Sequence, residues 1–172
     1  YKDRKILLSY INILQKNGID ELAVLYIEDI DFKKNRTLTR KYAKSLSQLN
    51  KTNKAISTLE HFIESSSILD REVSFELLML YLKEEKLDHA IPLIEKLISI
   101  DPSDDDFIFR IALLCFDNER YNLSEKYFNI LLSKFYVPDN INFFLGQIDY
   151  KNKRYDEALL HYQRIQQGTF VN

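Results

Sequence analysis

The chain of 172 residues contains only three glycines and three prolines, and 45% of its residues are hydrophobic while 29% are charged. This balance is typical of a folded protein, and the shortage of turn residues argues against a fold of short hairpins and favours helices. The 24 basic and 26 acidic side chains are mixed along the chain, without the basic stripe of a nucleic-acid-binding surface. A single cysteine excludes an internal disulfide and a multi-cysteine metal site.

Ten amphipathic helices are predicted from apolar residues that recur at i, i+3, i+4 and i+7 between short polar breaks. Pro92 conflicts with the interior of the sixth helix, so a late helix start or a mild kink is expected there. In chain order the predicted ranges are 5–16, 20–32, 37–49, 53–65, 72–84, 88–99, 106–117, 121–134, 140–151 and 155–167.

A small residue near the start of every second helix recurs along the chain, with successive spacings of 32, 35, 34 and 34 residues. Such a regular period predicts a repeat architecture, in which each helical pair buries its faces against its neighbours. We expect one array over 1–172, with approximate repeats 4–35, 36–70, 71–104, 105–138 and 139–172. The small residues are Ala23, Ala55, Ala90, Ser124 and Ala158.

The third repeat carries the fullest pattern of large, small and aromatic positions, with Leu77, Leu78, Tyr81, Ala90, Ile94, Leu97 and Pro102. This pattern resembles the tetratricopeptide repeat family, and the resemblance extends over essentially the whole chain. Cys115, Ser124 and Asp149 depart from the family pattern. The resemblance implies an all-α, right-handed superhelical solenoid of about five repeats, with a concave surface lined by the first helix of each repeat.

The resemblance also implies a peptide-binding groove, lined by the fifth, ninth and twelfth positions of each repeat. The groove is expected to be polar and basic in the first two repeats and apolar from the third onward, although these aromatics could serve packing alone. The predicted groove residues are Asn12, Arg40, Lys44, Phe75, Met79, Leu82, Phe109, Leu113, Phe116, Phe143, Gln147 and Tyr150.

The leading function is therefore an adaptor that binds an apolar segment of another protein or peptide. The alternative is a structural role, as the interior of a longer array or as a surface for self-association, for example in a homodimer. A clamp for a C-terminal carboxylate is disfavoured, since Leu8, Phe75 and Met79 stand where it needs polar groups.

Catalysis and cofactor binding are not expected. The run from Asp101 to Asp106 lacks the glycine and glutamate of a calcium loop and is expected to cap a helix. His61, His89 and His161 lie in three different repeats, and Cys115 falls on an inward position. No phosphate loop or nucleophile motif occurs, so the chain is predicted not to be an enzyme.

The compartment is left open by the sequence, as cytoplasmic or periplasmic. No stretch approaches the roughly 18 apolar residues of a membrane span, so no direct membrane insertion is expected. The start at Tyr1 lacks an initiator Met and a signal peptide, and a fragment of a longer protein, either soluble or anchored, is expected. The closing residues 143–171 are similar to repeats of bacterial envelope adaptor proteins.

Overall fold

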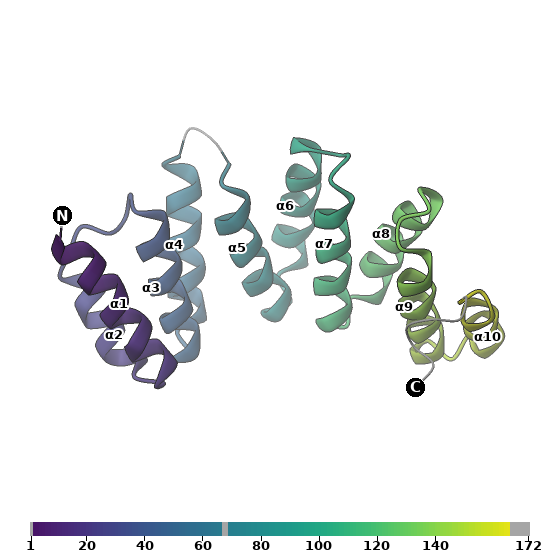
Figure 1. The fold of residues 1–172 in the computed structure, drawn as a ribbon, viewed down its shortest axis with the longest axis horizontal. Coiled ribbons are helices and arrows are strands. Elements are labelled where there is room, and N and C mark those ends of the chain that lie inside the picture. Colours follow the sequence, from purple (N-terminus) through teal and green to yellow (C-terminus); the bar gives the residue numbers. More distant parts are fainter. Residues whose placement is uncertain (1, 67–68, 166–172) are drawn as a thin grey trace. The chain divides into compact units, whose positions relative to one another are not determined.

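The computed structural model describes residues 2–66 and 69–165, and within them the chain forms ten α-helices and no strand (Figure 1). This all-α architecture confirms the predicted fold class. The helices are α1 (Lys2–Lys16), α2 (Asp20–Glu28), α3 (Arg36–Gln48), α4 (Thr52–Glu64), α5 (Arg71–Lys83), α6 (Leu87–Ile100), α7 (Asp105–Asp117), α8 (Tyr121–Ser133), α9 (Pro138–Lys151) and α10 (Tyr155–Gln163).

The chain divides into two compact units, Tyr1–Leu93 and Ile94–Asn172, and each is described by itself. In unit 1, α1 packs on α2 and α3 on α4, while α2 contacts α3 and α4 contacts α5. In unit 2, α7 packs on α8 and α9 on α10, and α8 contacts α9. Each unit is therefore built from helical hairpins that pack against the next hairpin along the chain.

The small residues of the repeat are all buried in the structure. Ala23, Ala55, Ala90 and Ser124 are completely buried, and Ala158 is nearly so. The Ser124 hydroxyl donates a hydrogen bond to the carbonyl oxygen of Ala112 on the preceding helix, at 2.9 Å. A small side chain permits this close approach, as the sequence period predicts.

The turn inside each hairpin has the same backbone geometry in all five repeats. One residue adopts a left-handed conformation, with φ between 58° and 69°. The next residue donates its backbone N–H to the carbonyl five positions earlier, at 2.8 to 2.9 Å, which is the Schellman helix ending. These left-handed residues, with the same successive spacings as the small residues, are Gly18, Asn50, Glu85, Glu119 and Lys153.

Side-chain caps begin three of the first helices. Asn35, Asp70 and Asp104 each accept a hydrogen bond from the backbone N–H three residues later, at 2.9 to 3.0 Å. These bonds satisfy amide groups that have no partner inside the helix. The predicted capping role of the acidic run before α7 is thus confirmed at Asp104.

The largest differences from the predicted ranges are at two helix ends, and the late start expected for the sixth helix does not occur. The second helix was expected to reach residue 32 but ends at Glu28, because Phe32 is buried against the Tyr42 ring, with centroids 4.5 Å apart. The last helix ends at Gln163 instead of 167, and residues 166–167 lie outside the described part. The sixth helix begins at Leu87, so Pro92 lies inside it without a late start. In the part of the chain that the structure describes, no helix is long and apolar enough to cross a membrane.

Candidate binding surfaces

The twelve predicted groove residues all lie on first helices of the hairpins. In unit 1, Asn12 is on α1, Arg40 and Lys44 are on α3, and the other three are on α5: Phe75, Met79 and Leu82. In unit 2, α7 carries Phe109, Leu113 and Phe116, and α9 carries Phe143, Gln147 and Tyr150. The two sets belong to different units, so each is considered separately.

Unit 1 has two adjoining hollows on the side of α3 that faces α5. The first, of about 280 Å³, is polar and is lined by Gln15, Thr37, Arg40, Lys41, Lys44 and Glu76. The second, of about 340 Å³, is more apolar and is lined by Ala43, Lys44, Ser47, Gln48, Leu59, Glu76, Met79 and Leu80. Because Lys44 and Glu76 line both hollows, we treat the pair as one feature, the α3–α5 groove.

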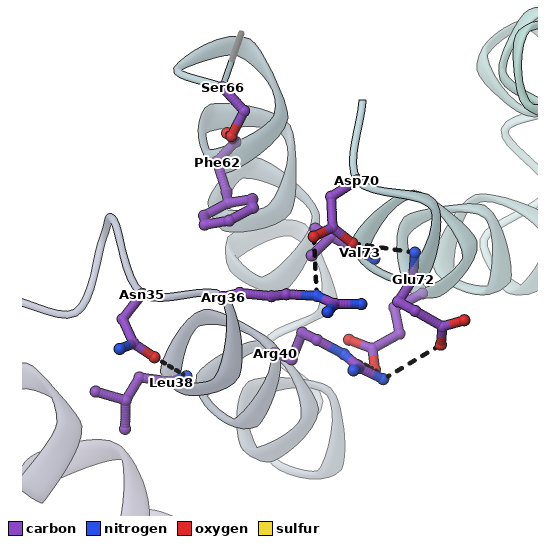
Figure 2. A network of polar contacts seen from close by, with 10 residues as sticks. Asn35, Arg36, Leu38, Arg40, Phe62, Ser66, Asp70, Glu72 and Val73 are labelled. Atoms are coloured by element: carbon purple, nitrogen blue, oxygen red, sulfur yellow. Dashed lines mark hydrogen bonds and ion pairs between the residues drawn. The ribbon is translucent and has the colours of Figure 1, made fainter. Parts of the chain in front are cut away.

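Two arginines of α3 pair with carboxylates at and after the start of α5 (Figure 2). Arg36 Nε lies 2.8 Å from an oxygen of Asp70, the residue that caps α5. Arg40 Nη2 lies 2.6 Å from Glu76 Oε1 and 3.8 Å from Glu72 Oε2. The hydrogen bond to Glu76 raises the pKa of Arg40, against the opposing effect of burial. Arg40 therefore joins α3 to α5.

Lys41 lies at the polar end of the groove, among neutral partners from α1. Its Nζ donates to the Asn12 side-chain oxygen and is 3.5 Å from Gln15 Oε1. Gln15 in turn donates to the Lys41 carbonyl and to the Ser45 hydroxyl, both at 2.8 Å. Burial, followed by the nearby charges of Lys44 and Arg40, lowers the pKa of Lys41.

The middle and apolar end of the groove are open. Lys44 is exposed, and within the described residues its ammonium group has no hydrogen bond or ion pair. Met79 is 40% exposed, although it is a large apolar side chain. Leu82 is only 1% exposed and belongs to the core, while Phe75 is half-buried. Of the three predicted apolar positions on α5, Met79 is thus the most accessible.

The predicted phenylalanines of unit 2 surround another ring, Phe144. Phe144 stacks on Phe128 of α8, with centroids 5.3 Å apart and planes 8° from parallel. It also makes edge contacts with Phe116 at 5.3 Å, Phe143 at 5.5 Å and Phe109 at 6.3 Å. Phe109, Phe116 and Phe143 are each half-buried. They therefore combine a packing role with partial exposure.

The remaining predicted residues of unit 2 differ in exposure. Leu113 and Gln147 are half-buried, on α7 and α9 respectively. Tyr150 is 59% exposed and contacts Tyr155 at the start of α10, with ring centroids 5.6 Å apart. Among the predicted groove residues of unit 2, Tyr150 is thus the most accessible.

The acidic run before α7, Cys115 and the three histidines were the other candidate groups, and their contacts are those of packing or of helix ends. Lys134 lies 2.6 Å from Asp105, and the Tyr136 hydroxyl donates to Asp106. Within residues 2–66 and 69–165, no group of three or more His, Cys, Asp or Glu side chains could hold a metal ion. Cys115 is fully buried, and burial raises its pKa to about 12. His161 is half-buried beside Asn142 and Asp149, whereas His61 and His89 are exposed.

Lys41 and Glu76 line the groove but were not among the predicted residues. Lys41 follows Arg40 in sequence. The family's groove positions, applied to this repeat, include Arg40 but not Lys41. Glu76 meets Arg40 across 36 residues of sequence, so helix periodicity alone contains no signal for their contact. The basic charges on 40–44 and the acidic charges on 70–76 were the available hint.

The helical hairpins recur with a period of about 34 residues, which defines the chain as an α-helical repeat array. Residues 72–104 match the family model described as tetratricopeptide repeat, which confirms the resemblance inferred from the sequence. A comparison with curated protein sequences gives no match.

Solved structures of MamA, a tetratricopeptide-repeat protein, are similar to the chain in fold. MamA residues 41 to the end from Desulfovibrio magneticus RS-1 gives a TM-score of 0.68 at 14% identity, covering 94% of this chain and 92% of that one. MamA of AMB-1 gives 0.64 at 18%, covering 94% of each chain. MamA of MSR-1 gives 0.61 at 20%, covering 93% and 90%. At these identities the likeness shows the fold alone.

Proposed function

We propose that this chain is a protein-interaction adaptor, which binds an apolar segment of another protein on the faces formed by its first helices. Repeat arrays expose long surfaces of this kind and commonly use them for binding. A role in binding rather than catalysis also agrees with the structural surroundings of Cys115, His161 and the acidic run before α7.

The observation that carries the proposal is the position of Met79 in the α3–α5 groove. Met79 is exposed beside Leu80 and faces a hollow of about 340 Å³ that the first helices α3 and α5 line in part. Methionine adapts its shape to varied apolar partners, and an exposed apolar side chain in a hollow gains stability when a partner covers it. In unit 2 the partly exposed rings of Phe116 and Phe143 offer a second apolar surface.

Photocrosslinking from position 79 tests the proposal. A photoreactive amino acid replaces Met79 in one variant and exposed Lys96 on α6 in a matched control, and both are irradiated in extract of the source organism. A specific partner is expected to crosslink from position 79 and not from 96. Purified partner is then titrated against the wild type and the Met79→Glu variant, with circular dichroism as the check on folding.

Loss of affinity in a folded Met79→Glu variant is the expected result, since a carboxylate at the apolar end of the groove opposes burial. Equal affinity for wild type and variant would overturn the proposal for this groove. Phe109 is a poorer test position, because its ring contacts Phe128, Tyr136 and Phe144 and its replacement by Glu would disturb the core.

A structural or self-association role is the second candidate. It is favoured by exposed apolar side chains on α1 of unit 1 and on α10 of unit 2. In unit 1, Ile6 and Ile13 of α1 are mostly exposed, and in unit 2 the same holds for Leu159 and Leu160 of α10. Such side chains often pack against a further repeat or a second copy. Sedimentation of the wild type beside Ile13→Glu and Leu160→Glu decides this: a dimer that both variants dissociate supports self-association, and a wild-type monomer argues against it.

A further inference from the structure

The α3–α5 groove is amphipathic along its length. Its polar end holds Arg40 and Lys41, and its apolar end holds Met79 and Leu80. Lys44 and Glu76 line both parts and therefore mark the point where the polar and apolar surfaces meet. A ligand that fills both hollows must present a polar group and an apolar group next to each other.

Of the three basic groups at the polar end, only Arg40 has an ion-pair partner among the described residues. Arg40 is paired with Glu76 and is near Glu72, so its charge is compensated. Lys41 is bonded to the neutral side chains of Asn12 and Gln15, and Lys44 has no partner among the described residues. Two ammonium groups on adjacent turns of α3 thus share the groove, and neither forms an ion pair with the described residues.

The surroundings of Lys41 already oppose its positive charge. Burial is the main cause of the lowered pKa of Lys41, the charges of Lys44 and Arg40 add to it, and the charge of Glu76 opposes it only in part. A bound anion would reverse the repulsion and would replace water around these ammonium groups with a charge-assisted hydrogen bond. The groove therefore gains most from a negatively charged ligand group.

We infer that the α3–α5 groove recognises a peptide segment in which an acidic side chain stands beside an apolar one, the carboxylate lying at Lys41 and Lys44 and the apolar side chain at Met79. The inference rests on the proposed adaptor function and names the chemistry of its partner. A single carboxylate fits better than a phosphate, because Glu72 and Glu76 flank the site and Arg40 is already engaged. The attraction between the carboxylate and the two lysines would add specificity to the apolar contact at Met79.

The test begins with a library of random 12-residue peptides, selected for binding to the full chain. Each peptide is inserted within a carrier protein, so that it has no free C-terminus. The recovered sequences are expected to be enriched in Asp or Glu beside Leu, Ile, Met or Phe. The best is synthesised with blocked ends, together with versions in which the acid becomes Asn or Gln, or phosphoserine. Each is titrated against the wild type, Lys44→Gln and the matched control Lys96→Gln, which removes an exposed charge outside the groove.

The acidic peptide is expected to bind Lys44→Gln about tenfold more weakly than the wild type, and to bind Lys96→Gln unchanged. The neutral peptide is expected to bind the wild type more weakly than the acidic peptide does. Its affinity should fall little further in Lys44→Gln, because neutralising the peptide and removing the lysine charge abolish the same contact. The difference between the peptides should shrink as salt is raised.

Equal binding of the acidic and neutral peptides would overturn the inference, as would tighter binding of the phosphoserine peptide or binding that requires a free C-terminus. The proposed function fails separately. If selected peptides ignore the acid but are lost in Met79→Glu, the adaptor function stands and only the charge inference falls. If no selected peptide is lost in Met79→Glu, the adaptor function of this groove falls as well.

Discussion

Arg40 and Glu76 join two consecutive hairpins of unit 1 through an ion pair with Nη2 and Oε1 2.6 Å apart. Both side chains are about a quarter to a third exposed, so solvent screens the pair and its contribution is modest. A double-mutant cycle with Arg40→Met and Glu76→Gln is expected to give a coupling of about 0.5 to 1 kcal/mol in urea unfolding. The coupling should decrease at high salt, and a value near zero at low salt would contradict a bridging role.

Phe144 is the residue of unit 2 whose loss should cost the most aromatic packing, because four phenylalanine rings contact it. Phe144→Ala is expected to lower the free energy of unfolding by about 2 kcal/mol, less than for a fully buried phenylalanine because this ring is half-buried. Tyr150→Ala serves as the control, because this exposed ring should cost less than about 1 kcal/mol. Urea titrations followed by circular dichroism measure both, and equal effects would refute the central role of Phe144.

The helices and their pairing were largely predictable from the sequence. Periodic apolar positions define each amphipathic face, and the small residues such as Ala55 and Ala158 mark the close approach inside a hairpin. The end of α2 was not predictable in this way. Ile30 and Phe32 continue the apolar pattern, but Phe32 reaches the core from a loop, and its carbonyl accepts a bond from the Thr39 hydroxyl.

The candidate groove was only partly predictable. Family positions correctly place Lys44 and Met79 on first helices, but they say nothing of which charge is compensated by a distant residue, as Arg40 is by Glu76. They also select Phe143, whereas its neighbour Phe144 makes the central packing contacts. Adjacent aromatic residues on a helix point in directions about 100° apart, and only the packed structure determines which ring contacts more of its neighbours.

Gly146 on α9 is required by a ring of the next helix. A Cβ at this position would lie 2.6 to 2.9 Å from three atoms of the Tyr162 ring. Gly146→Ala is therefore expected to destabilise the chain by about 1 kcal/mol, although alanine is the better helix former by a similar amount. In a Tyr162→Ala background the clash is absent, and the same substitution should stabilise by about 1 kcal/mol. Thermal or urea unfolding of the wild type, the two single variants and the double variant checks this change of sign.

His161 should make stability depend on pH below neutrality. Burial is the first cause of its lowered pKa, and the charges of Asp149, Arg164, Glu125 and Arg154 partly cancel around it. Because the folded pKa lies below the unfolded value of about 6.5, the unfolded chain binds the proton first. The stability due to neutral His161 is therefore complete above that pH and is lost as the pH falls through it toward the folded pKa.

The variant His161→Gln tests this dependence, since an amide can still bond to Asn142 but does not titrate. Its free energy of unfolding is expected to change less between about pH 7 and 5 than that of the wild type. His61→Gln is the matched control, because it removes an exposed imidazole from α4. The same pH profile for wild type and His161→Gln would show that the burial of His161 does not affect stability.

Cys115 should react only after unfolding. Its side chain is fully buried in α7, and burial raises the pKa of the thiol to about 12, so little thiolate exists at pH 8. A disulfide reagent such as DTNB is expected to modify the native chain slowly and the urea-unfolded chain at once, with Cys115→Ala as the blank. Because modification requires opening of α7, its rate at low urea should report the local stability of this helix. Rapid modification of the native chain would mean that α7 opens readily, and a packed core around Phe144 would then be untenable.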